Sequence, residues 1–428
     1  MSVKVFIGSG SETESVGRYD CAIGLGPSSL GMMVHHNLGL LGQGAGSLPE
    51  EVRTFLVVGI GVWAADKAVP RQSAPDAWTR QLQVSLPAAG WGEVMGAFAS
   101  LAGFLSGDAW RLEARPVRPS LELGSKPTES WHPDCVCLFS GGVDSLAGAI
   151  DLLEAGRRVL LVSHYDFGQL ASSQNMLTEG LSRHYGPAQV RRWGFRVQFE
   201  APELSLRSRS LLFLALGLAA ASVWGRKLPL FIPENGWISL NPPLTGNRLG
   251  SYSTRTTHPY FITGLKQFLA SVGIAHNLIN PYQYQTKGEM LAQSRNQTLL
   301  RDLLPYTISC AHPVASRWRK DRQGNCGYCF PCLLRRAALH AVGWDDGREY
   351  GQDVLRQPEV LASRAKGADL RSLLYLLAEW RRHPRPEELL WQTGPIPGEP
   401  QEVAESINLV GRGIEEIDRW IRVKGGDL

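Results

Sequence analysis

Short apolar segments alternate with turn-like segments in the N-terminal part of the chain. Four of them are apolar or β-branched and are bounded by Gly, Pro and Ser, which is typical of strands. They lie at 3–7, 20–24, 54–63 and 81–86. Apolar residues at helical spacing over 91–104 predict a helix. We therefore expect an α+β domain with a mostly antiparallel sheet.

A different alternation follows a segment rich in Pro, Ser and Glu at 116–133, which we expect to be a linker. The predicted elements then alternate as in βαβ units: strand 135–139, helix 146–155, strand 158–163, helix 172–185 and strand 194–199. This order predicts an α/β fold with a parallel sheet and helices on both faces. Ligands of such sheets bind beyond the carboxyl ends of the strands.

The C-terminal part of the chain shows helical periodicity over 368–382 and 402–423. The second segment carries an apolar stripe that is expected to pack against the protein itself: Ile407, Val410, Ile414, Ile417 and Ile421. We expect no chemistry there. The pattern predicts three parts: an α+β accessory domain at 1–130, an α/β domain at 131–343 and a helical extension at 344–428.

Composition and charge exclude several classes of protein. The 428 residues are 43% hydrophobic and 20% charged, with a net charge of +4, and such a mild excess argues against nucleic acid unless it is clustered. The most apolar run, 211–224, falls short of the roughly 20 residues that a membrane span needs. The first residues show no apolar core of a signal peptide, so we expect a cytoplasmic protein without membrane contact.

The turn after the first strand of the α/β part has the residues of a phosphate cradle. It reads Ser140, Gly141, Gly142, Val143, Asp144 and Ser145. The two glycines lack a Cβ that would block an anion, the serine hydroxyls can donate, and the following helix start adds a positive dipole end. Asp144 fits if Mg²⁺ lies between its carboxylate and the phosphate. The alternative is a plain glycine turn.

Further candidate contacts lie in later loops. Tyr165 and Gln169 follow the second strand, beside the cradle, and are expected to contact nucleotide or substrate. Arg207 and Arg209 precede a buried helix, and Lys287 lies near another helix start. Cations are unfavourable there unless an anion is close, so we expect phosphate contacts, with solvated side chains as the alternative.

The long loop at 233–260 mixes polar residues with Trp, Tyr and Leu, which favours a functional loop over a disordered one. Its side chains would suit a planar ring that forms hydrogen bonds. Glu234 and Asn235 are candidates for the ring edges, and Arg255 or His258 for a carboxylate.

Three cysteines crowd into one short segment, Cys326, Cys329 and Cys332, and Cys310 lies 16 positions upstream of it. Four thiolates at such spacing can surround one Zn²⁺ ion in a tetrahedron. An odd total of seven cysteines does not fit a secreted disulfide framework. Scattered core cysteines and redox use are the alternatives.

The string from Ser140 to Ser145 resembles the PP-loop of ATP pyrophosphatases, an adenine nucleotide alpha hydrolase-like fold. Members of that superfamily transfer AMP to a carboxyl or carbonyl oxygen and release pyrophosphate. Together with the cysteine cluster, it makes 135–342 similar to QueC, the 7-cyano-7-deazaguanine synthase family. Weaker resemblances lie at 165–169, at Arg209-Ser210 and at 286–289.

This resemblance implies ATP as co-substrate, Mg²⁺ and Zn²⁺ as cofactors, and 7-carboxy-7-deazaguanine as substrate. The PP-loop would hold pyrophosphate, Asp144 the Mg²⁺, and Arg209 and Lys287 the charge that develops as pyrophosphate leaves. The extra parts at both ends are more similar to the QueC-like proteins of anti-phage systems, QatC and the type IV CBASS relative. Their activated deazaguanine is joined to a protein amine, so the resemblance implies a protein acceptor encoded nearby.

Three other functions stay open from the sequence. The first is nitrile synthesis from ammonia, as in the housekeeping enzyme. The second is tRNA thiolation, which another PP-loop group performs with cysteines near the loop. The third is a nucleic-acid-binding module in which the cysteine cluster is a zinc ribbon.

Overall fold

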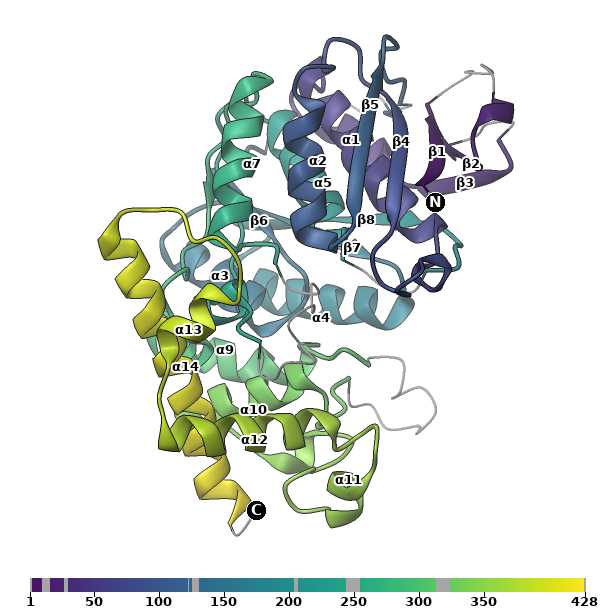
Figure 1. The fold of residues 1–428 in the computed structure, drawn as a ribbon. Helices are drawn as coiled ribbons and strands as arrows, with labels where there is room; N and C mark the ends of the chain where they lie inside the picture. The colour runs from purple at the N-terminus through teal and green to yellow at the C-terminus, as the bar shows by residue number, and fades with distance from the viewer. Residues whose placement is uncertain are drawn as a thin grey trace.

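The structure is a computed structural model. It describes residues 2–9, 16–26, 30–121, 123–124, 131–203, 207–243, 255–312 and 324–426. In Figure 1 the N-terminal half lies at the top and the C-terminal extension at the bottom and left, with the middle of the chain between them.

One ten-stranded sheet organises the fold, with the strand order β10-β9-β6-β7-β8-β3-β2-β1-β4-β5. All neighbouring strands pair in parallel except β3 and β8, which are antiparallel. The strands of the N-terminal half are β1 (Ser2–Gly8), β2 (Cys21–Leu25), β3 (Met32–His36), β4 (Gln81–Pro87) and β5 (Ala109–Arg115). The others are β6 (Cys135–Leu138), β7 (Val159–Tyr165), β8 (Val190–Gln198), β9 (Leu230–Phe231) and β10 (Leu278–Ile279).

The expectation of a mostly antiparallel α+β domain is wrong. The segment at 54–63 is not a strand, because it lies inside helix α1 (Glu50–Ala68), which is buried on nearly every side. An apolar run without periodicity does not distinguish a buried strand from a buried helix. Helices α1 and α2 (Met95–Ser106) connect successive strands, and such crossovers make the strands parallel.

The predicted alternation after residue 134 is confirmed. Strand β6 is followed by α3 (Val143–Glu154), and β7 by α4 (Gly168–Tyr185). The apolar run at 211–224 forms the buried helix α5 (Arg209–Ser222). No helix of the described residues is long and apolar enough to cross a membrane.

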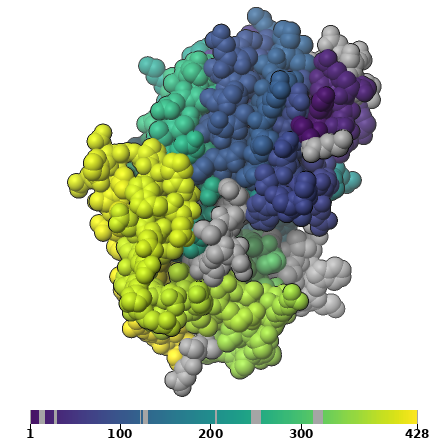
Figure 2. Space-filling view, viewed as in Figure 1, coloured from purple at the N-terminus to yellow at the C-terminus, as the bar shows by residue number. Residues whose placement is uncertain are grey.

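The remaining helices come after β9 in the chain, and those that lie after residue 343 form the C-terminal extension. They are α6 (Gly236–Leu240), α7 (Pro259–Ser271), α8 (Lys287–Gln293), α9 (Gln297–Leu303), α10 (Phe330–Ala341), α11 (Pro358–Ala362), α12 (Ala368–Arg382), α13 (Pro386–Trp391) and α14 (Pro400–Gly425). The predicted stripe of α14 does pack inward, since Val410, Ile414 and Ile417 are buried in one apolar cluster. Figure 2 shows the extension against the surface of the N-terminal half.

The two halves of the sheet meet at the β3–β8 pair, where His35 and His36 lie opposite Gln198 and Val197. One hydrophobic cluster continues across this seam. Helices α1 and α5 approach closely there, because a Cβ on Gly59 would lie 2.9 Å from the Cβ of Ala215.

A buried charge network joins α1, α5 and the start of β5. Arg71 and Arg80 each bridge Asp66 and Asp108, with Arg80 Nη2 2.7 Å from Asp108 Oδ2. Asp66 also accepts from the backbone N–H of Ser208 at 3.1 Å, just before α5 begins. Charges taken out of water in this way need every partner, because the loss of one leaves another charge buried and uncompensated.

We expect Arg80→Ala to lower the free energy of unfolding by about 3–5 kcal/mol, since the Arg80 side chain is 2% exposed and its loss leaves two buried carboxylates short of partners. Arg111→Ala is the matched control. Arg111 pairs with Glu113 but is 76% exposed, and such pairs contribute less than about 1 kcal/mol. Urea unfolding of both variants measures the difference, and equal losses would contradict the structural role of the network.

Candidate nucleotide site and metal centre

The turn between β6 and α3 requires glycine at its second position. Gly141 has φ +88°, and a Cβ there would lie 3.1 Å from Gln174 Cγ. Within the turn, Ser140 Oγ accepts from Gly142 N at 3.3 Å and lies 3.2 Å from Ser145 Oγ. The hydroxyls thus lie beside the first amides of α3, where the helix dipole favours an anion.

Two contacts from distant segments fix this turn. Gln174 of α4, which is fully buried, donates through Nε2 to the carbonyls of Ser140 (3.1 Å) and His164 (3.3 Å). Ile308 N donates to the Gly141 carbonyl at 3.0 Å. Gln174 was not predicted from the sequence, where its only signal is a glutamine on the buried face of an amphipathic helix.

A cavity of about 550 Å³ opens beside the turn. This is within the range of about 300–1,000 Å³ typical of ligand pockets. Its wall contains six of the residues selected from the sequence: Ser140, Gly142, Val143, Asp144, Glu234 and Lys287. The wall also contains Ser309, Phe330 and Asp369, which the sequence analysis did not select.

Asp144 has charged and hydrogen-bonding partners from two other segments of the chain. Lys287 Nζ forms an ion pair with it, and Asn235 donates to it from N (3.1 Å) and from Nδ2 (2.7 Å). Burial acts to raise the pKa of Asp144, but the Lys287 ammonium and the Asn235 hydrogen bonds outweigh it and hold the pKa below its usual value. The carboxylate is therefore ionised at neutral pH.

Glu234 is half-buried in the same wall and behaves differently. Burial raises the pKa of Glu234 to about 7, and the nearby Asp144 charge acts in the same direction. Thr257 Oγ1 donates to Glu234 Oε2 and partly offsets this effect. The cavity thus holds one carboxylate that stays ionised and one that titrates near neutral pH.

The other candidates for nucleotide contact lie one strand away from the turn. Arg209 Nε donates to His164 Nδ1 at 3.4 Å, at the end of β7. Burial and the Arg209 charge lower the pKa of His164 to about 4. Tyr165 and Gln169 lie on the same side, at the end of β7 and the start of α4. Arg207 instead lies over the Trp78 ring and donates to the Ser106 carbonyl.

The structure does not bring Arg255 and His258 into this cavity. Arg255 lies over the Phe104 ring, 4.6 Å from its centroid, and donates to the Phe104 carbonyl. His258 accepts from Tyr260 N at the start of α7 and lies 3.2 Å from Thr393 Oγ1. Asn235 was expected to contact a ring edge. Its side chain instead donates to Asp144 through Nδ2 and accepts from Ile238 N through Oδ1. Residues 244–254 of this loop lie outside the described residues.

The C-terminal extension holds the helix start that carries Lys287. Glu416 of α14 accepts from Thr286 Oγ1 at 2.6 Å and from Gly288 N at 3.0 Å. Arg412 of α14 donates to Glu289 at 2.7 Å. A Cβ on Gly288 would lie 2.4 Å from Glu416 Oε2 and 2.9 Å from the Cβ of Ala341, so a larger residue there would displace the Glu416 carboxylate. The extension, which was expected to carry no chemistry, therefore supports the backbone segment from which a cavity side chain extends.

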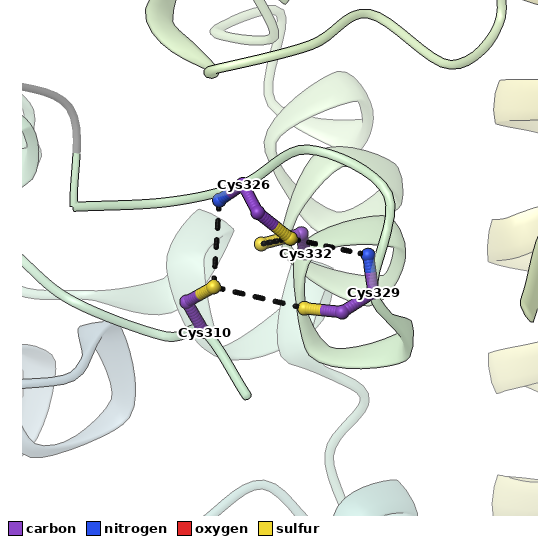
Figure 3. Close-up of side chains that lie close together, drawn as sticks. All are labelled: Cys310, Cys326, Cys329 and Cys332. Atoms are coloured by element: carbon purple, nitrogen blue, oxygen red, sulfur yellow. Dashed lines mark hydrogen bonds between the residues drawn. The ribbon is translucent and has the colours of Figure 1, made fainter. Parts of the chain in front are cut away.

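The four cysteines expected as metal ligands come together, with their sulfur atoms within 4.8 Å of one another (Figure 3). Cys310 and Cys329 sulfurs are 3.8 Å apart, and those of Cys326 and Cys332 are 3.9 Å apart. Sulfur atoms around a tetrahedral Zn²⁺ with bonds of about 2.3 Å lie about 3.8 Å apart. The cluster therefore has the size of a four-thiolate zinc site.

Backbone amides support the same interpretation. Cys326 N points at Cys310 Sγ (3.4 Å) and Cys329 N at Cys326 Sγ (3.4 Å), as Figure 3 shows. Such N–H groups stabilise thiolate charge. The centre also borders the cavity, because Ser309 precedes Cys310 and its hydroxyl lies 3.5 Å from the position of a Cβ on Gly142.

A mostly parallel sheet, a glycine turn at the carboxyl end of β6 and a four-cysteine cluster are consistent with a PP-loop domain that carries a zinc centre. The chain is similar to a curated 7-cyano-7-deazaguanine synthase from Novosphingobium aromaticivorans, at 28% identity over 253 residues. The alignment covers 53% of this chain and 99% of that enzyme, which supports a QueC-like relationship. No family model matches the chain. No solved structure matches it either.

We expect the purified protein to hold about one Zn²⁺ per chain and Cys329→Ser to lose most of it, because three thiolates bind this ion far more weakly than four. Atomic emission spectroscopy measures the metal, and thermal unfolding with and without a chelator measures its stabilising effect. Cys21→Ser on β2 is the control and should keep the metal. A stable protein that binds no zinc would contradict this assignment.

Proposed function

We propose that this protein uses ATP to adenylate the carboxylate of 7-carboxy-7-deazaguanine and then joins the activated acid to an amine as an amide. The observation that carries the proposal is the cavity in which the glycine turn, Asp144 and Lys287 meet. Its support from outside the structure is the similarity to a protein named 7-cyano-7-deazaguanine synthase.

In this proposal the amides and hydroxyls from Ser140 to Ser145 bind the phosphates of ATP. Asp144 would hold Mg²⁺, which prefers one or two carboxylates together with phosphate oxygens and would supply charge neutralisation there. Lys287 would leave its ion pair with Asp144 and bind the phosphates instead, where it stabilises the charge of departing pyrophosphate. Arg209 remains a candidate for the same charge, from the end of β7.

The ring of the substrate would occupy the part of the cavity between the 308–311 segment and the starts of α10 and α12. Phe330, Pro331 and Leu334 offer apolar contact there. In this proposal Glu234 still contacts the substrate. It does so at the reacting carboxyl group of the substrate, beside Asp144 and Lys287, and not at an edge of the ring. The roles expected of Arg255 and His258 would require them to turn from their present contacts.

A protein amine in anti-phage defence is our preferred acceptor. Support comes from the part of the chain after 135–342, the range of the sequence resemblance, because α12 contributes Asp369 to the cavity wall and Glu416 of α14 binds the start of α8. This part offers a surface for a larger acceptor than ammonia. The reduced thiols of the cysteine cluster fit a cytoplasmic setting.

Nitrile formation from ammonia is the second candidate, favoured by the similarity to an enzyme named 7-cyano-7-deazaguanine synthase. The cysteines next to the turn argue against the tRNA thiolation alternative. Burial raises the pKa of Cys135 to about 12 and that of Cys137 well above its usual value, so neither is a ready nucleophile.

We expect the protein to release pyrophosphate and AMP from ATP only when Mg²⁺ and the deazaguanine carboxylate are both present. Lys287→Met should lower the rate about 10²–10³-fold, as the loss of one charge-stabilising group does. Lys227→Met, on the exposed turn after α5, should leave it unchanged. No pyrophosphate release from the unaltered protein would contradict the proposal. A nitrile formed with ammonia alone would favour the second candidate.

We expect Glu416→Ala to lower the same rate about 10-fold, because a displaced Lys287 no longer meets the phosphates. Glu416→Gln should restore most of it, since an amide oxygen still accepts from Thr286 and Gly288. The exposed Glu405 on the same helix provides the control Glu405→Ala. An equal loss in the Gln variant, or an unchanged rate in the Ala variant, would contradict this positioning role.

A further inference from the structure

Glu234 begins a chain of hydrogen-bonding side chains that leaves the cavity. Thr257 Oγ1 donates to Glu234 Oε2, and Ser239 Oγ lies 2.6 Å from Thr257 Oγ1. Asn280 Nδ2 lies 3.5 Å from Ser239 Oγ. Thr257 and Ser239 are 5% and 2% exposed, so the middle of this chain is shielded from water.

The chain ends at a second cavity, of about 420 Å³, on the other side of α6. Ser239, Thr257 and Asn280 all line this second cavity, whereas Glu234 lines the first. Other polar side chains surround it, among them Lys266, Gln283 and Glu402. Such a lining suits water, so the hydrogen-bonded chain connects the wall of the candidate reaction site to a polar space elsewhere.

Amide formation from an ammonium ion releases protons, and a base must take them. The candidates in the first cavity are its carboxylates, Asp144, Glu234 and Asp369, which share the wall with the ammonium of Lys287. Asp144 is held ionised by its partners, and Asp369 accepts from Phe330 N at the start of α10. Glu234 has the pKa that suits a general base at neutral pH, about 7.

We propose that Glu234 accepts a proton from the acceptor amine, and that Thr257 and Ser239 carry this proton to the second cavity. The inference rests on the proposed function, because it concerns the second half of that reaction. It adds an identity for the base and a route for the proton when nucleotide and substrate fill the first cavity.

Each proton and each electron pair of this step has a defined destination. The acceptor nitrogen enters as an ammonium ion and gives one proton to the Glu234 carboxylate, which frees the lone pair. That pair forms the C–N bond at the acyl carbon, and the C–O bond to AMP breaks with its electrons on the phosphate oxygen. The second nitrogen proton moves to the departing phosphate. The products are the amide, singly protonated AMP and neutral Glu234, which loses its proton through Thr257.

The test separates the two halves of the reaction with two nitrogen nucleophiles. Ammonium must be deprotonated before it attacks, whereas hydroxylamine, a weaker base, is already neutral at pH 7 and traps activated acyl groups directly. Because Glu234 also contacts the substrate, Glu234→Gln is assessed by a ratio of rates. Pyrophosphate release and hydroxamate formation both depend on binding and activation, so we expect them to fall together by the same small factor. Amide formation with ammonium should fall by about 10²–10⁴-fold, the usual contribution of a general base.

Thr257→Val keeps the shape of the side chain and removes the hydroxyl. We expect it to slow amide formation with ammonium at least about 10-fold, while hydroxamate formation stays unchanged. Thr298→Val, at an exposed position on α9 away from both cavities, is the control and should behave as the unaltered protein.

Unchanged amide formation in Glu234→Gln, or loss of hydroxamate and pyrophosphate release together with the amide, would overturn the role of Glu234 as base. A defect in Glu234→Gln without one in Thr257→Val would overturn the proton route. Failure of the unaltered protein to release pyrophosphate would instead overturn the proposed function itself.

Discussion

The ion pair between Asp144 and Lys287 is the contact on which the candidate site depends. It brings the start of α3 and the start of α8 together across the cavity, although the two residues lie far apart in the chain. Asn235 completes the arrangement from a third segment, and α14 supports it from behind through Glu416. A charge pair this shielded is stable only while its hydrogen bonds are complete, so the arrangement depends on contacts from all four segments.

The sequence predicted the parts of the site that depend on local chemistry. The glycine turn, the alternation after residue 134 and the four cysteines are short-range patterns, and their geometry follows from backbone sterics and metal coordination. It did not predict Gln174, Asp369 or Glu416, because each acts through a contact with a residue distant in sequence. It placed Arg255 and His258 in the site from residue type alone, and that signal cannot say which way a loop turns.

The error in the N-terminal half has a specific cause. The segment at 54–63 is rich in β-branched and apolar residues because it is buried on all sides, and that burial hides the helical period. Once that segment is a helix, it connects β3 to β4 as a crossover, and β4 can pair in parallel with β1 in the same sheet. A single misassigned element therefore changed the predicted class of the whole half.

The antiparallel seam between β3 and β8 also limits how the molecule can be divided. A shortened chain beginning near residue 131 would lack β3, so β8 would become an unpaired edge strand. It would also lack α1, so the apolar face of α5 that α1 covers would be exposed. Unpaired backbone groups beside bare apolar surface invite association between copies. The N-terminal half thus shares one sheet and one hydrophobic cluster with the part of the chain that carries the candidate site.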